Sequence, residues 1–261
     1  MKLPMFHLDA FTGTVFGGNP AVVICVEEWL PDALLAAIAV EHNISTTAFL
    51  RKDGDAYEIR YFMPIGELSL VGHASLAAAH VLLRLLRPDL ASTTLRRRGG
   101  ALHVSKLDNG SSAITLPASP AQPCSAPAGL RAALGVPIAE VRANDAQYFA
   151  VLDSQSAVAR TTPDMDALMQ LDRDGVIVTA PGDDCDFVSR AFAPKEGLPE
   201  DPVCGSAHLA LVPYWSERLV RTEHRALQLS PRGGELHCAL TGGEVRLAGR
   251  CALYMEGAIT I

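Results

Sequence analysis

The chain has 261 residues, 49% of them hydrophobic, and a formal net charge of -7, which is the composition of a globular protein with one large core or two ordinary ones. The charge is spread along the sequence and the one basic cluster, Arg96, Arg97 and Arg98, is short, so neither nucleic acid nor an anionic membrane is an expected partner. No apolar run approaches the ~18 to 20 residues that span a bilayer, and no signal-peptide pattern follows Met1, so we expect a cytoplasmic protein.

The first half of the chain is predicted to contain short strands and two helices. Strand-like runs lie at residues 3–11, 21–26, 46–50, 57–62, 93–98, 101–106 and 112–116. Pro31 and Asp32 open a helix that runs to about Glu41, with proline in the first turn, where its missing N–H is tolerated. A second helix follows Gly72 over residues 73–86. It is apolar nearly all round, which predicts a buried helix at the centre of the fold.

The second half repeats this plan. Residues 117–127 are rich in Pro, Ala and Ser and are predicted to form a linker. One helix is expected from Pro163 and another from Ser206 to about Leu219. Strands are expected near residues 174–179, 186–193, 226–230, 234–240, 244–248 and 251–255. Many short strands with one apolar helix after a glycine fit a sheet wrapped around a buried helix better than alternating βαβ units.

Both halves carry the same motifs in the same order. The first half contains Pro31-Asp32, Arg60-Tyr61-Phe62-Met63-Pro64, Gly72-His73-Ala74-Ser75 and Arg98-Gly99-Gly100. The second contains, 130 to 134 residues later, Pro163-Asp164, Arg190-Ala191-Phe192-Ala193-Pro194, Gly205-Ser206-Ala207-His208 and Arg232-Gly233-Gly234. This period is too long for a solenoid repeat and indicates a duplicated domain. We therefore predict an α+β fold of two pseudo-symmetric lobes, 1–118 and 119–261, each a curled, mostly antiparallel sheet around a central helix.

The functional site is expected at the seam between the lobes, where the repeated glycines lie. Gly72 and Gly205 each lead into a helix, whose first turn carries unpaired N–H groups and roughly half a positive charge. Two such helix N-termini could hold a carboxylate and stabilise an enolate-like charge beside it. A single motif of this kind would most simply start a core helix; its repetition favours a function.

Three side chains near these glycines are candidates for proton chemistry. Asp201 and His73 could act as an acid/base pair, although a carboxylate before a helix can be a simple electrostatic anchor, and a lone histidine on an apolar helix is commonly a core residue. The position of His73 at the start of its helix favours exposure at the seam. Cys204 lies where a helix dipole would lower the pKa of a thiol; packing as a small apolar residue is the alternative. Ser206 would cap its helix or contact a ligand.

The cysteines do not form a metal-binding pattern. Cys25, Cys124, Cys185, Cys204, Cys238 and Cys251 include no CxxC pair and no close grouping with histidine. In a reducing compartment most of them are expected to pack as small buried hydrophobic residues. We therefore expect no metal site.

The motifs resemble those of the phenazine-biosynthesis PhzF-like family. The resemblance rests on Asp9-Ala10-Phe11-Thr12, Phe16-Gly17-Gly18-Asn19-Pro20, Asn43-Ile44-Ser45, Glu67-Leu68 with Gly72-His73, and above all Glu200-Asp201-Pro202-Val203-Cys204-Gly205-Ser206-Ala207-His208. It covers essentially the whole chain. It implies the diaminopimelate-epimerase-like fold, an active site between two lobes, no metal or organic cofactor, and a homodimer. The chemistry it implies is isomerisation or epimerisation of a small amino or cyclic acid by proton transfer.

The resemblance also implies site residues. It makes Gly72, His73, Asp201, Gly205 and Ser206 ligand-contacting residues, and it places Ser45 on the substrate side. Asn19, in the glycine turn before Pro20, joins the expected substrate contacts.

The family's acid/base glutamate does not carry over, because Thr46 stands in its place in Asn43-Ile44-Ser45-Thr46. A hydroxyl cannot replace a carboxylate as a proton shuttle near neutral pH. Epimerases of this fold use two thiols; Cys204 matches one, while Val71 stands at the other, so a symmetric two-thiol mechanism is excluded. A one-sided scheme remains, with Cys204 as thiolate base and Asp201 and His73 relaying protons. Glu41 and Glu67 are further candidate bases, each more simply explained as structural.

Three hypotheses follow from the sequence. The first is a cofactor-independent isomerase or epimerase that moves a proton on a small carboxylate substrate. The second is a family member altered at Thr46 that binds a small molecule without catalysing proton transfer. The third is a Cys204-dependent acyl transfer or cyclisation.

Overall fold

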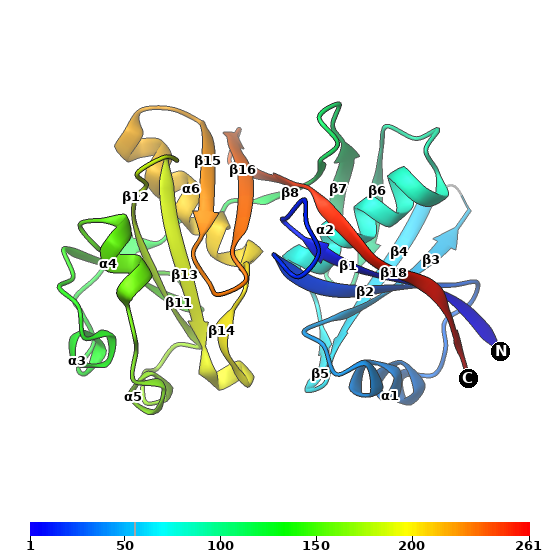
Figure 1. The fold of residues 1–261 in the computed structure, drawn as a ribbon, viewed down its shortest axis with the longest axis horizontal. Helices are drawn as coiled ribbons and strands as arrows, with labels where there is room; N and C mark the ends of the chain where they lie inside the picture. The colour runs from blue at the N-terminus through cyan, green and yellow to red at the C-terminus, as the bar shows by residue number, and fades with distance from the viewer. Residues whose placement is uncertain (55) are drawn as a thin grey trace. The chain divides into compact units, whose positions relative to one another are not determined.

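The computed structural model describes residues 1–54 and 56–261, and these form two compact units. Unit 1 contains Met1–Leu116 and Arg246–Ile261, and unit 2 contains Pro117–Val245. The last strand, β18 (Cys251–Thr260), belongs to unit 1, where it pairs antiparallel with β1 (Lys2–Ala10) along its whole length (Figure 1). The boundaries drawn from the sequence had left this strand with the second lobe. No helix in the described part of the chain is long and apolar enough to cross a membrane.

Unit 1 contains a mostly antiparallel sheet. Its strands are ordered β18, β1, β2 (Asn19–Val26), β3 (Thr47–Asp53), β4 (Ala56–Met63), β6 (Ser92–Arg97), β7 (Gly100–Lys106) and β8 (Ser112–Pro117), with the short β5 (Gly66–Leu68) beside the end of β4. Among these described strands, the pairs β2/β3 and β4/β6 run parallel and the others antiparallel. The predicted strands of this half are therefore confirmed.

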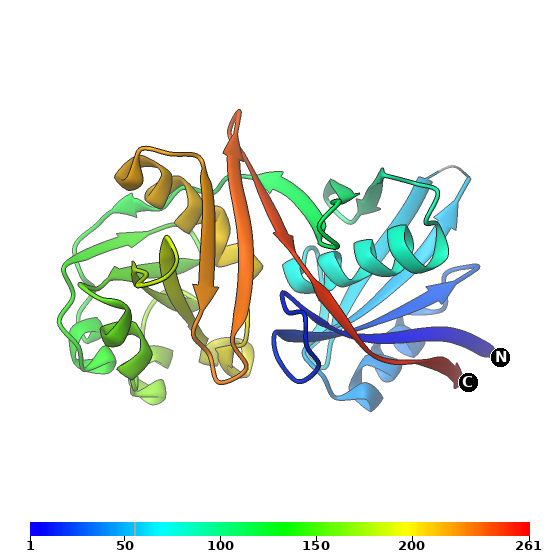
Figure 2. The ribbon, with the colours of Figure 1, turned by 45° about the horizontal axis from the view of Figure 1, so that its top comes forward.

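The central helix of unit 1 is α2 (Gly72–His80), which continues as a π-helical turn over Val81–Leu86. Every residue of α2 from the second to the eighth is buried. The helix contacts β1, β2, β3, β7 and β18, strands from both ends of the sheet, so the sheet curls around it (Figure 2). α2 is therefore the buried central helix that its apolar sequence predicted.

Helix α1 (Asp32–His42) covers the outer side of the same sheet. Leu35, Ile38 and Ala39 of α1 pack into a core with residues of β1 to β4, such as Phe49. The helix ends at Asn43, which adopts a left-handed conformation with φ 49° and returns its N–H to the last turn. Start and end agree closely with the helix predicted from Pro31.

Unit 2 repeats the pairings of unit 1. Its strands are ordered β9 (Gln122–Pro123), β10 (Glu140–Ala143), β11 (Gln147–Val151), β12 (Gly175–Pro181), β13 (Phe187–Ala193), β15 (Glu223–Gln228) and β16 (Gly234–Thr241), with β14 (Leu198–Asp201) beside β13. The strand β17 (Glu244–Gly249) crosses the division between the units. The parallel pairs β11/β12 and β13/β15 correspond to β2/β3 and β4/β6. The predicted linker is partly a strand, since β9 pairs with β10 as β18 pairs with β1.

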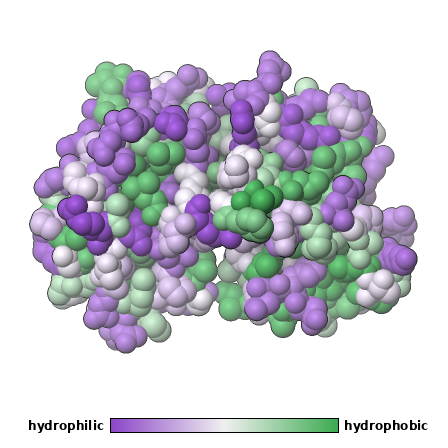
Figure 3. All heavy atoms as spheres, viewed as in Figure 1, coloured by the Kyte–Doolittle hydropathy of each residue, from purple (hydrophilic) through white to green (hydrophobic). Residues whose placement is uncertain are grey.

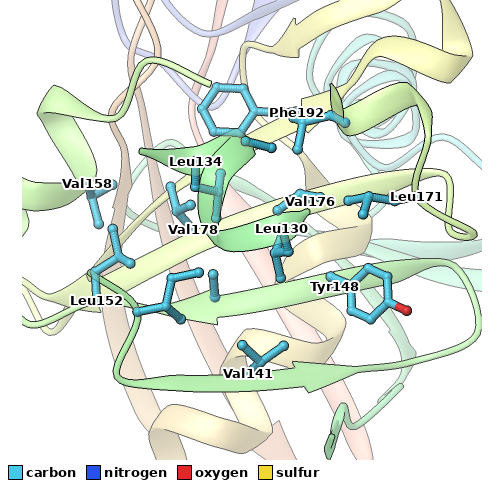
Figure 4. Packing of buried hydrophobic residues seen from close by; sticks show 14 of the residues in the cluster. Leu130, Leu134, Val141, Tyr148, Leu152, Val158, Leu171, Val176, Val178 and Phe192 are labelled. Carbon is cyan, nitrogen blue, oxygen red and sulfur yellow. The ribbon is translucent and has the colours of Figure 1, made fainter. Parts of the chain in front are cut away.

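The outer layer of unit 2 differs from that of unit 1. Three short helices, α3 (Leu130–Leu134), α4 (Gln155–Arg160) and α5 (Met165–Met169), replace the single helix α1. Only α5, capped by the side chain of Asp164, corresponds to the helix expected from Pro163. Figure 4 shows their anchors Leu130, Leu134 and Val158 packed against sheet residues such as Val178 and Phe192.

The central helix of unit 2 is α6 (Gly205–Leu219), as predicted. Its Trp215 is 1% exposed, stacks on Phe187 with 5.6 Å between ring centroids, and donates from Nε1 to Thr179 Oγ1 at 3.0 Å. Pro213 lies inside the helix without ending it. Proline has no N–H for the carbonyl of Leu209, and that carbonyl instead accepts the N–H of Ser119 at 2.9 Å.

The duplication extends to side chains. Arg60 on β4 donates hydrogen bonds from Nε and Nη2 to the carboxylate of Glu67, at 2.7 and 2.9 Å. Arg190 on β13 donates from the same two atoms to the carboxylate of Glu200, at 2.7 and 2.8 Å. Each guanidinium also lies about 5 Å from the ring of the phenylalanine two residues later. Glu67 is therefore held in an ion pair that both halves share, which accounts for it as a structural residue.

Candidate functional site

The first candidate half-site lies in unit 1, at the N-terminus of α2. Gly72 follows Val71, an extended residue with no side-chain cap, so the first-turn N–H groups are not capped by the Val71 side chain. A chain of hydroxyl groups supports this turn from below: Ser75 Oγ lies 2.6 Å from Tyr61 Oη and donates to the carbonyl of Val71 at 2.7 Å. The turn is thereby held in a fixed position while its N–H groups point toward the start of the helix.

His73 is connected to β2 through Ser45, which precedes β3. Ser45 Oγ lies 2.6 Å from the carbonyl oxygen of Pro20, 3.2 Å from Asn19 Oδ1 and 3.2 Å from His73 Nε2. Ser45 has one proton, and the carbonyl can only accept, so the shortest contact takes that proton. His73 must then donate from Nε2, which leaves Nδ1 as its basic nitrogen. Four residues predicted for the site therefore lie in unit 1: Asn19, Ser45, Gly72 and His73. Three of them, Asn19, Ser45 and His73, share one hydrogen-bond network centred on Ser45 Oγ.

The burial of His73 differs from the expectation. Its side chain is 6% exposed, and burial lowers the pKa of His73 to about 3. The imidazole is therefore neutral near pH 7 and cannot serve as a cationic acid there. Its first-turn position indicated exposure, but the segment that carries Ser45 packs against it.

Thr46 is fully buried at 0% exposure, one residue after Ser45. Its carbonyl accepts the N–H of Val22 at 3.0 Å, while its Oγ1 is buried and has no hydrogen-bond partner in the described structure. A buried hydroxyl without a partner is destabilising by about 1–3 kcal/mol. The side chain that replaces the family's glutamate is thus a polar group that the described part of unit 1 leaves unsatisfied.

The second candidate half-site lies in unit 2, at the N-terminus of α6. Asp201 Oδ1 accepts the N–H of Val203 at 3.2 Å, a turn that leads the chain into Cys204 and Gly205. Asp201 is half-buried and Ser206, in the first turn, is exposed. Ser206 is therefore open to a ligand, and its Oγ lies 3.3 Å from Cys204 Sγ.

The pKa of Cys204 moves in the opposite direction from the expectation. Burial, helped by the negative charge of Asp201, raises the pKa of the thiol to about 12, and the residue is 7% exposed. The hydrogen bonds of the thiol with Ser206 and with the backbone of Ala207 lower this pKa, but they do not offset the loss of hydration. Cys204 is therefore a neutral thiol at pH 7, and the thiolate that the one-sided scheme and the acyl-transfer hypothesis require is not favoured.

Gln228, which the sequence analysis did not single out, holds this half-site together. It is 1% exposed at the end of β15; its Oε1 accepts the N–H of Cys204 at 2.9 Å and its Nε2 donates to the carbonyl of Asp201 at 2.6 Å. Both ends of one buried amide thus fix the loop between Asp201 and Cys204. One signal was available: Gln228 and Arg97 occupy the same place in the repeat, each paired across a hairpin with the last glycine of an Arg-Gly-Gly motif.

If this half-site is catalytic, Gln228→Leu is expected to lower its turnover by about 10- to 100-fold, because displacing a catalytic loop by about 1 Å has effects of this size. KM should change much less than kcat, since Gln228 is buried and both ends of its amide are bonded to the loop. The readouts are kcat, KM and urea unfolding. Gln170→Leu, on an exposed position of unit 2, is the matched control. A Gln228→Leu protein that loses stability but keeps the wild-type kcat would contradict the positioning role.

The central helices are supported alike in both halves. His208 Nδ1 lies 2.8 Å from the carbonyl of Cys204, four residues earlier, just as Ser75 reaches back to Val71. Its Nε2 is buried without a partner in the described structure, and burial lowers the pKa of His208 to about 4.

The predicted residues thus fall into two groups. Asn19, Ser45, Thr46, Gly72 and His73 lie in unit 1, and Asp201, Cys204, Gly205 and Ser206 lie in unit 2. Neither unit by itself brings His73 together with Asp201. Among residues 1–54 and 56–261, no group of three or more His, Cys, Asp or Glu side chains is arranged to hold a metal ion.

Comparison with known families identifies the chain. The model of the family described as phenazine biosynthesis-like protein matches residues 8–257. The chain belongs to this family. An uncharacterized isomerase of Pseudomonas aeruginosa is 43% identical over 261 residues, with both chains fully covered, and a human phenazine biosynthesis-like domain-containing protein is 34% identical over 288 residues, also with full coverage. The resemblance found in the motifs is therefore confirmed.

The fold is likewise shared with solved structures. A PhzF-family protein of Enterococcus faecalis matches with a TM-score of 0.96 at 42% identity, covering all of both chains. A hydroxyproline epimerase from Agrobacterium vitis matches with a TM-score of 0.67 at 12% identity, covering 99% of this chain and 91% of its own. At that identity the second match shows a common fold only. The predicted α+β, epimerase-like fold is confirmed.

Proposed function

We propose that this protein is a cofactor-independent isomerase or epimerase that moves a proton on a small, carboxylate-bearing amino or cyclic acid. The observation that carries the proposal is the repeated helix N-terminus, Gly72 in unit 1 and Gly205 in unit 2, each at the start of a rigidly packed central helix. The second has the carboxylate of Asp201 four residues before it. Membership of a family with isomerase-named relatives supports the same class of reaction.

In this proposal the first-turn N–H groups of α2 and α6 bind the substrate and stabilise the negative charge that develops on proton removal. Asp201 is the acid/base: its carboxylate takes a proton from a carbon and the resulting acid returns a proton to carbon, so the protein is unchanged after one turnover. Neutral His73, Ser45 and Asn19 bind and orient the substrate. Cys204, as a neutral thiol, packs at the start of α6.

The proposal is tested by exchange of carbon-bound hydrogen. The protein is incubated in heavy water with a panel of amino acids and cyclic acids, and deuterium incorporation is followed by mass spectrometry. Incorporation into at least one substrate, at a rate that scales with protein concentration, is the expected result. A panel that gives none would leave the second hypothesis, a binding protein, as the better account.

Thr46 supports that second hypothesis, because its buried hydroxyl is no substitute for a carboxylate. Thr46→Glu separates the two, with Thr46→Val, of nearly the same shape, as the control. If the wild type is the enzyme proposed here, it exchanges hydrogen without a carboxylate at this position, and Thr46→Val retains most of that activity. If exchange appears only in Thr46→Glu, the wild type is a binder.

Association and location remain predictions. We propose a homodimer, and β18 is the described surface that supports this: Leu253, Tyr254 and Met255 are each at least 38% exposed on it. Figure 3 shows hydrophobic residues exposed among hydrophilic ones on one face of the molecule. A cytoplasmic location is proposed from the sequence alone.

A further inference from the structure

Unit 1 carries a hollow that belongs to neither half-site. Its volume is about 390 Å³, within the range of small-molecule pockets. It lies where β4 and β6 run side by side, and it is lined by Trp29, Asp32, Glu58, Ile59, Arg60, Glu67, Arg96, Arg97 and Arg98. Four guanidinium groups thus face three carboxylates.

The carboxylates of the hollow are already occupied. Glu67 is held by both Nε and Nη2 of Arg60, and Asp32 accepts from Nη1 of the same guanidinium at 2.9 Å. Glu58 accepts from Arg51 and from Trp29 Nε1, the latter at 3.0 Å.

Two arginines of the hollow, Arg97 and Arg98, have no carboxylate within hydrogen-bonding distance among the described residues, whereas Arg96 pairs with Asp53. Arg97 donates from Nη1 to the backbone carbonyls of Ser69 and Arg98, and its Nε is buried without a partner in the described structure. The side chain of Arg98 is 78% exposed and reaches Glu67 only at 3.7 Å. Within residues 1–54 and 56–261, Arg97 therefore pairs with no carboxylate, and Arg98 has only this long ion pair with Glu67, which Arg60 already holds.

Other arginines of the chain show what such a group binds. In each of five arginines, Nε and Nη2 both donate hydrogen bonds to the same carboxylate group; these are Arg51, Arg60, Arg87, Arg190 and Arg225. This edge of the guanidinium matches the spacing of two oxygens on one anion. In Arg97 the Nε of that edge is buried, whereas Nη2 donates no hydrogen bond to a described residue, so Nη2 is the atom that an external oxyanion would take.

The repeat shows that this charge is particular to unit 1. Gln228 stands at the position of Arg97 in unit 2, and both ends of its neutral amide are bonded to its own loop. A residue needed only to tie the loop could be an amide in unit 1 as well. Arg97 makes the corresponding tie to Ser69 and adds a charge.

We propose that the hollow is a binding site for a small molecule that presents an oxyanion, a phosphate or a carboxylate group, to Arg97 and Arg98. Trp29 forms one wall, with the guanidinium of Arg60 5.4 Å from its ring centre. The site lies on the outer side of β4 and β6, whereas α2 packs on the other side of the sheet, since Glu58 and Arg60 alternate with buried Tyr57, Ile59 and Tyr61 along β4. It does not depend on the proposed isomerase activity.

The test is a titration of the full chain with sodium phosphate and, separately, with citrate, at an ionic strength kept constant with sodium chloride. Trp29 fluorescence reports binding, because the other tryptophan, Trp215, is fully buried in unit 2; Trp29→Phe confirms the source of the signal. The wild type should show a saturable change with at least one anion, and which anion acts identifies the group that the site takes. Arg97→Gln and Arg98→Gln should each raise Kd about tenfold, the loss of one charge-assisted pair.

Arg160→Gln removes the same charge from an exposed position of unit 2 and should leave Kd unchanged. The proposal is overturned if neither anion gives a saturable change beyond that of chloride, or if all three variants bind equally well. Because Arg98 is exposed in a turn, Arg98→Gln remains informative even if Arg97→Gln fails to fold. These outcomes are independent of hydrogen exchange at the half-sites.

Discussion

Asp201→Asn is expected to lower the rate of carbon-bound hydrogen exchange by about 10² to 10⁴-fold, the usual contribution of a positioned acid/base group. The amide has nearly the same shape, and its oxygen can still accept the N–H of Val203, so the loop before α6 should keep its conformation. The effect should therefore fall on kcat with little change in thermal stability. Rates are measured by deuterium incorporation under saturating substrate.

Asp166→Asn is the matched control, because Asp166 is exposed in α5 and lies outside both half-sites. It should retain the wild-type rate. An Asp201→Asn protein that exchanges hydrogen as fast as the wild type would show that Asp201 is not the acid/base. Glu41 would then be the remaining candidate base from the sequence, because Arg60 holds Glu67 in an ion pair.

Acidification is expected to destabilise the protein through its buried histidines. Burial lowers the pKa of His208 from 6.5 to about 4. In the unfolded chain His208 therefore becomes protonated below pH 6.5, whereas in the folded chain it becomes protonated only near pH 4. The free energy of unfolding therefore falls as pH decreases through this window. Between pH 7 and pH 5 the loss from His208 alone should be about 2 kcal/mol.

His208→Ser isolates this contribution, because serine can make the same bond to the carbonyl four residues earlier that Ser75 makes in unit 1. The variant should be less stable at pH 7, where it leaves a cavity, but its stability should depend less on pH, by about 2 kcal/mol between pH 7 and 5. Urea unfolding at the two pH values measures both. A variant of His208 with the wild-type pH dependence would contradict the assignment.

The fold followed largely from the sequence because the repeat displays it twice. The helices after Gly72 and Gly205 were predictable from their apolar runs and from the glycines that open them. α3 and α4 were not predicted, because a helix of five or six residues has too few apolar positions to show the hydrophobic period of a helix. Pro213 did not end α6, since a backbone N–H from a distant segment satisfies the carbonyl that proline leaves free.

The positions of the candidate site residues in the fold were predictable from the sequence, but their environments were not. His73 and Cys204 were identified by position, yet their burial depends on strands far away in the sequence, and burial reverses the chemistry expected of both. Gln228 was missed because a single glutamine in a strand has no local signal, and the one indication was its match to Arg97 in the repeat. Its role comes only from the contacts that bring β15 to the loop after Asp201.

The most direct test of the proposed function compares His73→Gln, Asp201→Asn and the double variant in the heavy-water exchange assay. If both half-sites act in one reaction, the two losses are not additive, and the double variant is about as slow as the slower single variant. Two losses that multiply independently, or exchange that continues at the wild-type rate in the double variant, would contradict the proposal that His73 orients the substrate from which Asp201 takes the proton.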